Sequence, residues 1–209
     1  TLYYQLNNGT YPNKPFQGML LERVDKPDKP RMIKVPAVTD RIVYTLLFHR
    51  LEPYFQEEVK KYPIFGLKDK GVKAALDLLI PRIKSDTYVL KLDFQGYFDT
   101  IPRNKLLDVM RGYKIPGEEL RLTKAAINAP VNLPTTPKRV VEKFAHKFQP
   151  YETNIGIPQG CAFSPLLASI YALDIEKLIV REGYFSVRYI DDIIILLPSK
   201  KEAESMFKK

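Results

Sequence analysis

Short strand-like apolar runs and longer helical periods follow one another along the N-terminal part of the chain. The runs at 18–24 and 31–35 flank a stretch of aspartate, lysine and proline at 25–30, which predicts two strands joined by a stiff basic loop. Thr39 then suits the N-cap of a helix that should end near Pro53. Its predicted apolar face consists of Ile42, Val43, Leu46, Leu47 and Leu51. A second amphipathic helix is predicted over about 69–80.

The C-terminal part alternates in the same way. Residues 88–92 predict a buried strand ending at Asp93, and helices are predicted from Thr100 to about 111 and over 118–128. Four prolines make 129–155 irregular, and 156–160 reads as a loop. Ser164 should cap a helix that Gly183 ends, and strands at 184–189 and 193–197 form a hairpin. This order predicts an α+β fold whose antiparallel sheet carries helices on one face.

Composition narrows the class of protein only a little. The net charge of +9 over 209 residues suits a polyanionic partner, but it equally suits simple solubility. The single cysteine, Cys161, excludes an intramolecular disulfide, and two isolated histidines exclude a Cys/His zinc site. No apolar run approaches the roughly 18 residues of a membrane span. We therefore expect a cytoplasmic protein with no membrane partner.

Two adjacent acids, Asp191 and Asp192, lie between the last two predicted strands. An acidic hairpin turn explains them, although neither the asparagine nor the glycine that such turns prefer is present. A metal site explains them equally well, because ionised carboxylates near buried surface need a partner. Asp93 also ends a predicted strand, and acids from two strand ends could converge on hard divalent cations. That convergence favours the metal site.

Four blocks of sequence resemble the reverse transcriptases. Tyr189-Ile-Asp-Asp192 resembles their YxDD motif, and 93–99 and 156–165 resemble the two catalytic motifs that precede it. Residues 31–41 resemble the fingers segment of the bacterial group II intron type. The resemblance implies the fingers and palm of a right-hand polymerase, with fingers over 1–86 and palm over 87–209. Because the chain starts at Thr1 and ends in a helix-like stretch, we expect a thumbless piece of a longer protein.

The resemblance implies a two-metal catalytic centre. Asp93 and Asp191 would hold two Mg²⁺ ions, with Mn²⁺ as a substitute, and Asp192 would stand beside them as the second acid of the hairpin. Tyr189, which opens the same motif, is expected at the nucleic acid.

Other residues match nucleotide-binding positions of the family. Phe98 matches the steric gate that leaves no room for a 2′-hydroxyl, although a core aromatic residue would look the same. Gln159 matches the residue against the incoming nucleotide and template, and Gly160 would allow the backbone to come close there.

Basic residues of the fingers match phosphate-binding positions. Lys29 and Arg31 match residues that close over the triphosphate, and each could instead be a solvated side chain. Arg41 is expected either at the template backbone or in a structural contact. Lys34 departs from the family pattern, which has a small residue there.

The implied activity is RNA-directed DNA synthesis from deoxynucleotides on an RNA template with a DNA or RNA primer. One alternative is a maturase that mainly binds its cognate intron RNA, which would have no need of the three aspartates. Another is a defence-associated or CRISPR-associated reverse transcriptase with the same chemistry. Nothing in the sequence demands a homodimer.

Overall fold

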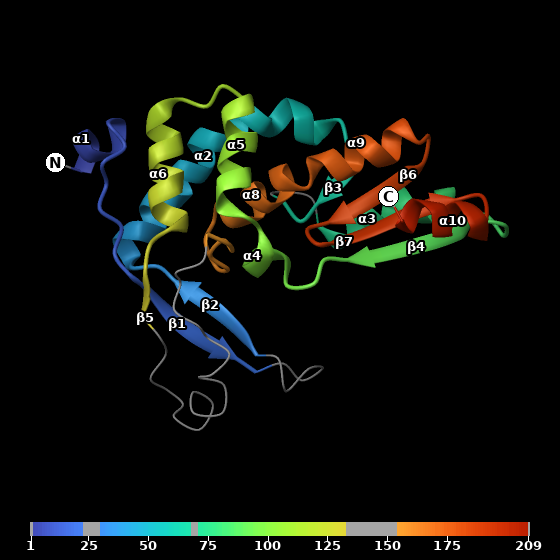
Figure 1. Cartoon of the computed structure of the whole chain (residues 1–209), viewed down its shortest axis with the longest axis horizontal. Coiled ribbons are helices and arrows are strands. Elements are labelled where there is room, and N and C mark those ends of the chain that lie inside the picture. The colour runs from blue at the N-terminus through green and yellow to red at the C-terminus, as the bar shows by residue number, and fades with distance from the viewer. Residues whose placement is uncertain (1, 23–29, 68–70, 133–153, 209) are drawn as a thin grey trace. The chain divides into compact units, whose positions relative to one another are not determined.

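The structure, a computed structural model, describes residues 2–22, 30–67, 71–132 and 154–208 (Figure 1). It divides into two compact units, each made of two stretches of chain. Unit 1 comprises Thr1–Glu52 and Phe98–Ser164, and unit 2 comprises Pro53–Tyr97 and Pro165–Lys209. The expected division into fingers over 1–86 and palm over 87–209 follows motif positions rather than contacts, and it stays a prediction.

Unit 1 combines helices with a three-stranded sheet. Strands β1 (Phe16–Leu21) and β2 (Arg31–Val35) pair antiparallel, and β5 (Val131–Asn132) joins β1 in parallel. Helices α1 (Leu2–Asn7), α5 (Arg103–Gly112) and α6 (Gly117–Ile127) belong to the same unit, with the first part of α2 (Val38–Lys60). Tyr44 packs edge-on against Phe163 and lies against Phe16, with ring centroids 5.2 and 5.9 Å away. These rings form part of an apolar core.

Helix α2 differs from its prediction at both ends. It begins at Val38 rather than at an N-cap of Thr39, and it continues through Pro53 to Lys60. Its buried stripe is Val43, Leu47, Leu51, Phe55 and Val59, a spacing of four that keeps one helix face in the core. This burial outweighs the roughly 3 kcal/mol that an internal proline costs a helix.

Unit 2 is built on a four-stranded sheet in the order β3-β6-β7-β4. The strands are β3 (Ile64–Phe65), β4 (Tyr88–Asp93), β6 (Phe185–Tyr189) and β7 (Asp192–Leu197). The pairings β4–β7 and β6–β7 are antiparallel, whereas the short β3 runs parallel to β6. The predicted α+β class and the hairpin are confirmed.

Helices pack against both faces of this sheet, whereas the sequence predicted them on one face. Helices α9 (Leu173–Arg181) and α10 (Lys200–Phe207) cover the face that carries Ile193, Ile195 and Leu197. On the other face, α3 (Val72–Leu79) packs through Ala75 and Leu79 against Val187 and Leu196. We call the face covered by α9 and α10 the closed face and the face against which α3 packs the open face. The helix α8 (Ser164–Tyr171) precedes α9, and the short η1 (Ile80–Arg82) follows α3.

Strand β4 is less buried than its apolar sequence predicted. It forms the edge of the sheet, and Tyr88 and Val89 are 47% and 51% exposed. Only Leu90 and Leu92 pack, from the closed face, against the helices. An apolar run alone does not distinguish a central strand from an edge strand.

Three further boundaries differ from the prediction. Thr100 ends the single-turn α4 (Tyr97–Thr100), and Pro102 precedes α5 in the N-cap position. The predicted helix from Ser164 to Gly183 is interrupted at Ala172 into α8 and α9. Within the predicted irregular stretch, 131–132 form β5 and 133–153 lie outside the described residues. The predicted loop over 25–30 also lies almost entirely outside them.

The turn between β6 and β7 has a strained backbone. Tyr189 and Asp192 close it as Cα partners, so Ile190 and Asp191 form a two-residue loop. Ile190 has φ of 57°, a left-handed conformation that β-branched residues avoid and that glycine normally takes. Gly66 lies against it with φ of +85°, and a Cβ there would come within 2.5 Å of Ile190 Cγ1. Gly66 therefore makes room for Ile190.

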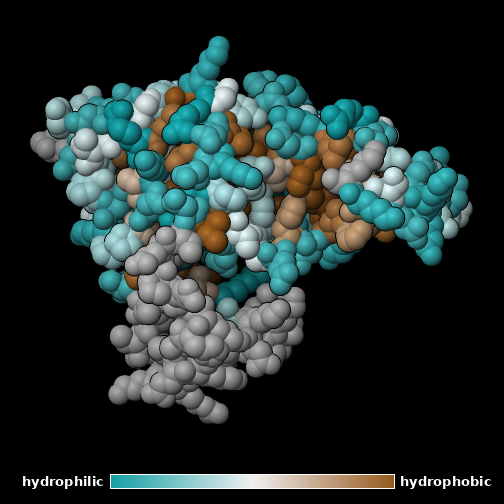
Figure 2. Space-filling model, in the orientation of Figure 1, coloured by the Kyte–Doolittle hydropathy of each residue, from teal (hydrophilic) through white to brown (hydrophobic). Residues whose placement is uncertain are grey.

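Among the described residues, no helix is long and apolar enough to cross a membrane. Figure 2 shows a mostly hydrophilic face on which hydrophobic atoms gather over α9 and the neighbouring strands of unit 2.

We predict that Gly66→Ala lowers the free energy of unfolding by about 2–4 kcal/mol, because it adds both backbone strain and a clash with Ile190. Gly183→Ala is the matched control in the same unit. It has φ of +81° with nothing within 4 Å, so it should cost only the strain, about 1 kcal/mol. Chemical denaturation measures both values. Equal losses for the two variants would show that Ile190 does not press on Gly66.

Candidate functional site

The three aspartates meet along the backbone at one end of the β4–β7 pair. Asp93 and Asp192 are Cα partners in the register, so they lie on the same face of the sheet. The amide of Phe94 donates to the carbonyl of Asp191 at 3.4 Å, which extends the ladder past Asp93 to the turn. Strand-end placement of the acids, predicted from the sequence, is thus confirmed, while their role as metal ligands stays a prediction.

The side chains of these aspartates do not form a closed cage. Within the described parts of the chain, no group of three His, Cys, Asp or Glu side chains is placed to hold a metal. The Asp192 carboxylate pairs with Lys91 at 3.2 Å. Asp93 is exposed, and Asp191 and Asp192 are half-buried. Mg²⁺ takes one or two protein carboxylates and completes its shell with water and phosphate oxygens. The pair Asp93 and Asp191 therefore suits such an ion without a third protein ligand.

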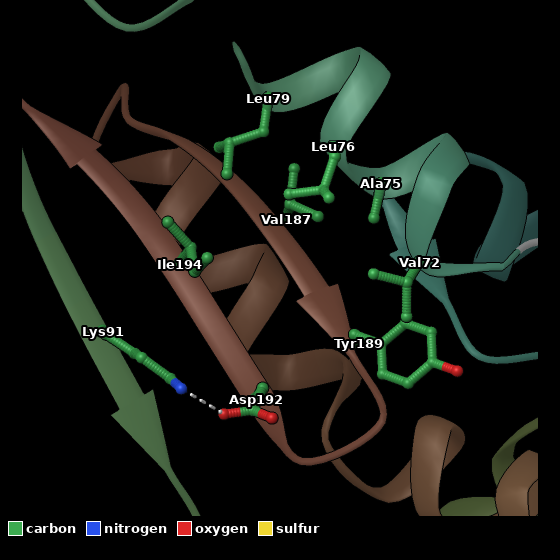
Figure 3. Close-up of a pocket in the computed structure, with 9 residues that line it drawn as sticks. All are labelled: Val72, Ala75, Leu76, Leu79, Lys91, Val187, Tyr189, Asp192 and Ile194. Carbon is green, nitrogen blue, oxygen red and sulfur yellow. Dashed lines mark ion pairs between the residues drawn. The ribbon is translucent and has the colours of Figure 1, made fainter.

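A pocket of about 190 Å³ lies on the open face beside Asp192. Figure 3 shows Leu76 and Val72 of α3 facing Ile194 across it, with Tyr189 below and the Lys91–Asp192 ion pair at one end. Tyr189 is half-buried between α3 and the hairpin. Its predicted contact with nucleic acid stays a prediction.

The chain segment that follows Asp93 is anchored to the closed face. Gly96 has φ of +60°, which allows a tight turn after the strand. Tyr97 stacks on Phe94 with ring centroids 4.7 Å apart, and its hydroxyl donates to the carbonyl of Ala168 at 2.6 Å. Burial raises the pKa of the Tyr97 hydroxyl, and the nearby Asp191 carboxylate raises it further. Tyr97 therefore remains neutral at physiological pH.

The turn carrying Asp191 is held from the closed face by a buried arginine. Arg188 is 1% exposed and donates to the carbonyl of Ile190 at 3.0 Å and to that of Ser169 at 2.9 Å. It also forms an ion pair with Glu176 of α9. Sequence reasoning missed Arg188. The available signal was alternation, since Phe185, Val187 and Tyr189 share one face and leave Arg188 on the other.

A second group of predicted residues comes together in unit 1. The amide of Ile157 donates to the carbonyl of Phe98 at 2.7 Å, and the Gln159 side-chain amide donates to Asp99 at 3.0 Å. Phe98 and Gln159, predicted to face the nucleotide, thus lie on two joined segments. The contact between Gln159 and Asp99 was not predicted from the sequence.

Gly160 allows the loop to approach strand β2. It has φ of +108°, and a Cβ there would lie 2.9 Å from Ile33 Cγ2 and 3.2 Å from the Lys34 carbonyl. The amide of Lys34 donates to the carbonyl of Gln159 at 2.8 Å. The close neighbour of Gly160 in the structure is therefore β2. Whether Gly160 also contacts a nucleotide stays a prediction.

The basic fingers residues have different surroundings. Arg31 is exposed at the start of β2, and its predicted triphosphate contact stays a prediction. Lys29 lies outside the described residues. Arg41 donates through Nε to the carbonyl of Pro36 at 3.3 Å, which is a structural contact. Its predicted contact with the template backbone stays a prediction.

Lys34 is a buried lysine beneath the 156–160 loop. It is 2% exposed, and burial lowers its pKa to about 8, with Asp99 opposing and Arg103 adding to the effect. Cys161, which also faces this lysine, has its pKa raised by burial to about 12. Lys34 is therefore charged at pH 7 at a cost to folding.

The lowered pKa of Lys34 predicts a stability that rises with pH. Above about pH 8 the folded chain loses this proton while the unfolded chain keeps it up to about pH 10.5, so unfolding becomes less favourable across that window. From pH 7.5 to pH 10, wild type should gain about 2 kcal/mol relative to Lys34→Met. Denaturant titrations at both pH values measure this, with Lys73→Met as the exposed control. A difference between wild type and Lys34→Met that does not change with pH would contradict the assignment.

The geometry can be compared with known proteins. The family model described as "Reverse transcriptase (RNA-dependent DNA polymerase)" matches residues 22–209. The "Uncharacterized 91 kDa protein in cob intron" of Schizosaccharomyces pombe is 23% identical over 171 residues, covering 79% of this chain and 19% of that protein. The "Group II intron-encoded protein LtrA" of Lactococcus lactis subsp. cremoris is 22% identical over 176 residues, covering 84% and 27%.

Solved structures agree on the fold. Apo telomerase from Candida tropicalis, truncated from its C-terminal domain, superposes with a TM-score of 0.65 at 15% identity, covering 93% of this chain and 45% of that one. The chain spans less than a third of the curated relatives it matches. Reverse transcriptases use divalent metal ions, which agrees with carboxylates at two strand ends. Since the family model matches residues 22–209, which is most of the chain, the chain belongs to the reverse transcriptase (RNA-dependent DNA polymerase) family.

Proposed function

We propose that the chain is the catalytic part of an RNA-directed DNA polymerase that extends a primer with deoxynucleotides on an RNA template. The observation that carries the proposal is the register of Asp93 with Asp192 and the backbone contact from Phe94 to Asp191. These contacts bring acids from two strands to one end of a sheet. The family match over residues 22–209 supports the same reading.

Asp93 and Asp191 would hold two Mg²⁺ ions. Their donor atoms are carboxylate oxygens, which hard cations prefer. The metals would activate the primer 3′-hydroxyl and stabilise the charge on the leaving pyrophosphate. Asp192 would contribute negative charge beside them. Its Lys91 partner is exposed on the same face, so the pair can open at little cost.

Residues of unit 1 would select and orient the nucleotide. Gln159 would lie against the incoming nucleotide, with its side-chain amide oriented by Asp99. Phe98 would exclude a 2′-hydroxyl. Arg31 and Lys29 would bind the triphosphate as charge-assisted donors, which suits guanidinium and ammonium groups.

The relatives point to an intron setting for the full protein. The two curated relatives described above are a group II intron-encoded protein and a protein in an intron. We propose that the full-length protein also binds the RNA of its own element. Its net charge of +9 over these 209 residues suits contact with phosphates. A maturase function without polymerisation is the second candidate, and it would leave Asp93 and Asp191 without a role.

Primer extension by the full-length protein on an RNA template tests the metal assignment. Asp93→Asn and Asp191→Asn should each lower the Mg²⁺-dependent rate by at least about 100-fold, because each removes a charge that binds the metal in the transition state. Asp174→Asn is the control, since that side chain is 83% exposed on α9, where it pairs with Lys177. Undiminished extension by Asp191→Asn would contradict the assignment of Asp191 as a metal ligand. Tight RNA binding by a wild type that extends no primer would favour the maturase.

The same assay tests the proposed sugar selection. Phe98→Val should raise ribonucleotide incorporation relative to deoxynucleotide incorporation by about tenfold or more, because a smaller side chain leaves room for the 2′-hydroxyl. Phe94→Val, which alters the other phenylalanine of this motif, is the comparison variant. An unchanged ratio in Phe98→Val would remove Phe98 from the role of gate.

A further inference from the structure

Arg188 and Glu176 form a buried ion pair. The Arg188 side chain is fully buried on the closed face of the sheet, and its charge is balanced by Glu176 of α9. Burial raises the pKa of the Glu176 carboxyl, and Arg188 opposes that shift. Burying two charges is often no better for stability than apolar residues of the same volume. Stability alone is therefore a weak reason for this pair.

The guanidinium reaches beyond Glu176 to the catalytic turn. Nε and Nη2 contact the Glu176 carboxylate, Nη2 also donates to the Ser169 carbonyl at 2.9 Å, and Nη1 donates to the Ile190 carbonyl at 3.0 Å. The planar fork of an arginine can make such divergent contacts at once, whereas the single ammonium of a lysine cannot. Arg188 thus links α8, α9 and the turn through one side chain.

The turn needs this support because its backbone is strained. Ile190 is held at φ of 57°, a conformation that costs a β-branched residue about 1–3 kcal/mol unless its surroundings fix it. Its amide donates to the carbonyl of Phe65 at 3.3 Å, and its carbonyl accepts from Arg188. The two peptide groups that flank the Ile190 Cα are therefore both anchored.

The two peptide groups that flank Asp191 are also held. Arg188 donates to the Ile190 carbonyl, which lies before the Asp191 Cα, and the Phe94 amide donates to the Asp191 carbonyl at 3.4 Å. With both flanking peptides fixed, the direction of the Asp191 Cα–Cβ bond is fixed as well. Loss of the first anchor would let the Ile190–Asp191 peptide rotate and move the carboxylate away from Asp93.

We propose that Arg188 is a positioning residue for primer extension, which holds the Ile190 carbonyl so that the Asp191 carboxylate is aimed at the catalytic metals. This inference rests on the proposed function, because it assumes that Asp191 binds metal. Mg²⁺ requires near-ideal octahedral geometry, so a small misdirection of one ligand should weaken both its binding and catalysis. Supporting residues around metal ligands typically contribute 10–100-fold in affinity or activity.

The decisive variant replaces both charges. Arg188→Met with Glu176→Met keeps the buried volume and leaves no unpaired charge, so the full-length protein should fold with a similar melting temperature. It has no donor for the Ile190 carbonyl. We expect kcat for primer extension to fall 10–100-fold and the half-saturating Mg²⁺ concentration to rise, with the KM for template–primer unchanged. Arg188→Lys, which keeps a charge opposite Glu176, should show the same two effects.

A matched ion pair and a second metal separate positioning from general loss of structure. Arg50 and Glu119 form a 2.5 Å ion pair in unit 1, whereas the catalytic turn belongs to unit 2. Arg50→Met with Glu119→Met should leave kcat and Mg²⁺ dependence unchanged. Mn²⁺ tolerates distorted coordination better than Mg²⁺, so it should restore part of the rate to both Arg188 variants but none to Asp191→Asn.

The outcomes distinguish this inference from the proposed function. A folded Arg188→Lys or double variant with wild-type kcat and Mg²⁺ dependence overturns the positioning role, even if Asp191→Asn is inactive. If Asp191→Asn itself extends primers normally, the metal assignment fails first. Equal losses with Mg²⁺ and Mn²⁺ in Arg188 variants that melt early would show that the arginine only stabilises the fold, and this too would overturn the inference.

Discussion

The candidate site depends on the buried contact between Arg188 and the backbone at Ile190. A two-residue hairpin with a β-branched residue at φ of 57° is a costly way to join two strands. It persists because the turn is held from several directions. Phe65 and Arg188 hold the amide and the carbonyl of Ile190, Phe94 contacts the carbonyl of Asp191, and Gly66 leaves space for the Ile190 side chain. The result is an acid presented at the end of the β4–β7 ladder on a rigid scaffold rather than on a loose loop.

A buried arginine also holds a backbone carbonyl in unit 1. Arg103 of α5 is buried, and its Nε donates to the carbonyl of Gly156 at 2.6 Å while Nη1 donates to Asn128 at 2.9 Å. It thereby holds the start of the 156–160 loop, which carries Gln159. In each unit, then, a buried arginine fixes a backbone carbonyl within a motif of the family. The arrangement uses the several donors of a guanidinium to satisfy buried carbonyls that no regular ladder reaches.

The sequence predicted what depends on local pattern and missed what depends on long-range packing. The hairpin, the strand end at Asp93 and the α+β class followed from short apolar runs and from the polar residues that end them. The continuation of α2 through Pro53 and the exposure of β4 did not, because both depend on which face another element covers. Asp93, Asp191 and Asp192 could be named from motifs, but Arg188 and Lys34 could not be assigned surroundings. Each is a single basic residue within an apolar run, and the sequence does not indicate what it contacts. The surroundings of Arg188 depend on the packing of α9, and those of Lys34 depend on the packing of the 156–160 loop.

The central claim is that Asp93 and Asp191 hold divalent metal at the end of the β4–β7 pair. Iron-mediated cleavage of the full-length protein tests it most directly, because Fe²⁺ in the place of Mg²⁺ reduces added hydrogen peroxide to hydroxyl radicals that cut the chain beside the bound ion. The account predicts cuts near residues 93 and 191, suppressed by excess Mg²⁺ and lost in Asp93→Asn. Cuts confined to other segments, or cuts at these positions that persist in an Asp93→Asn and Asp191→Asn double variant, would contradict it.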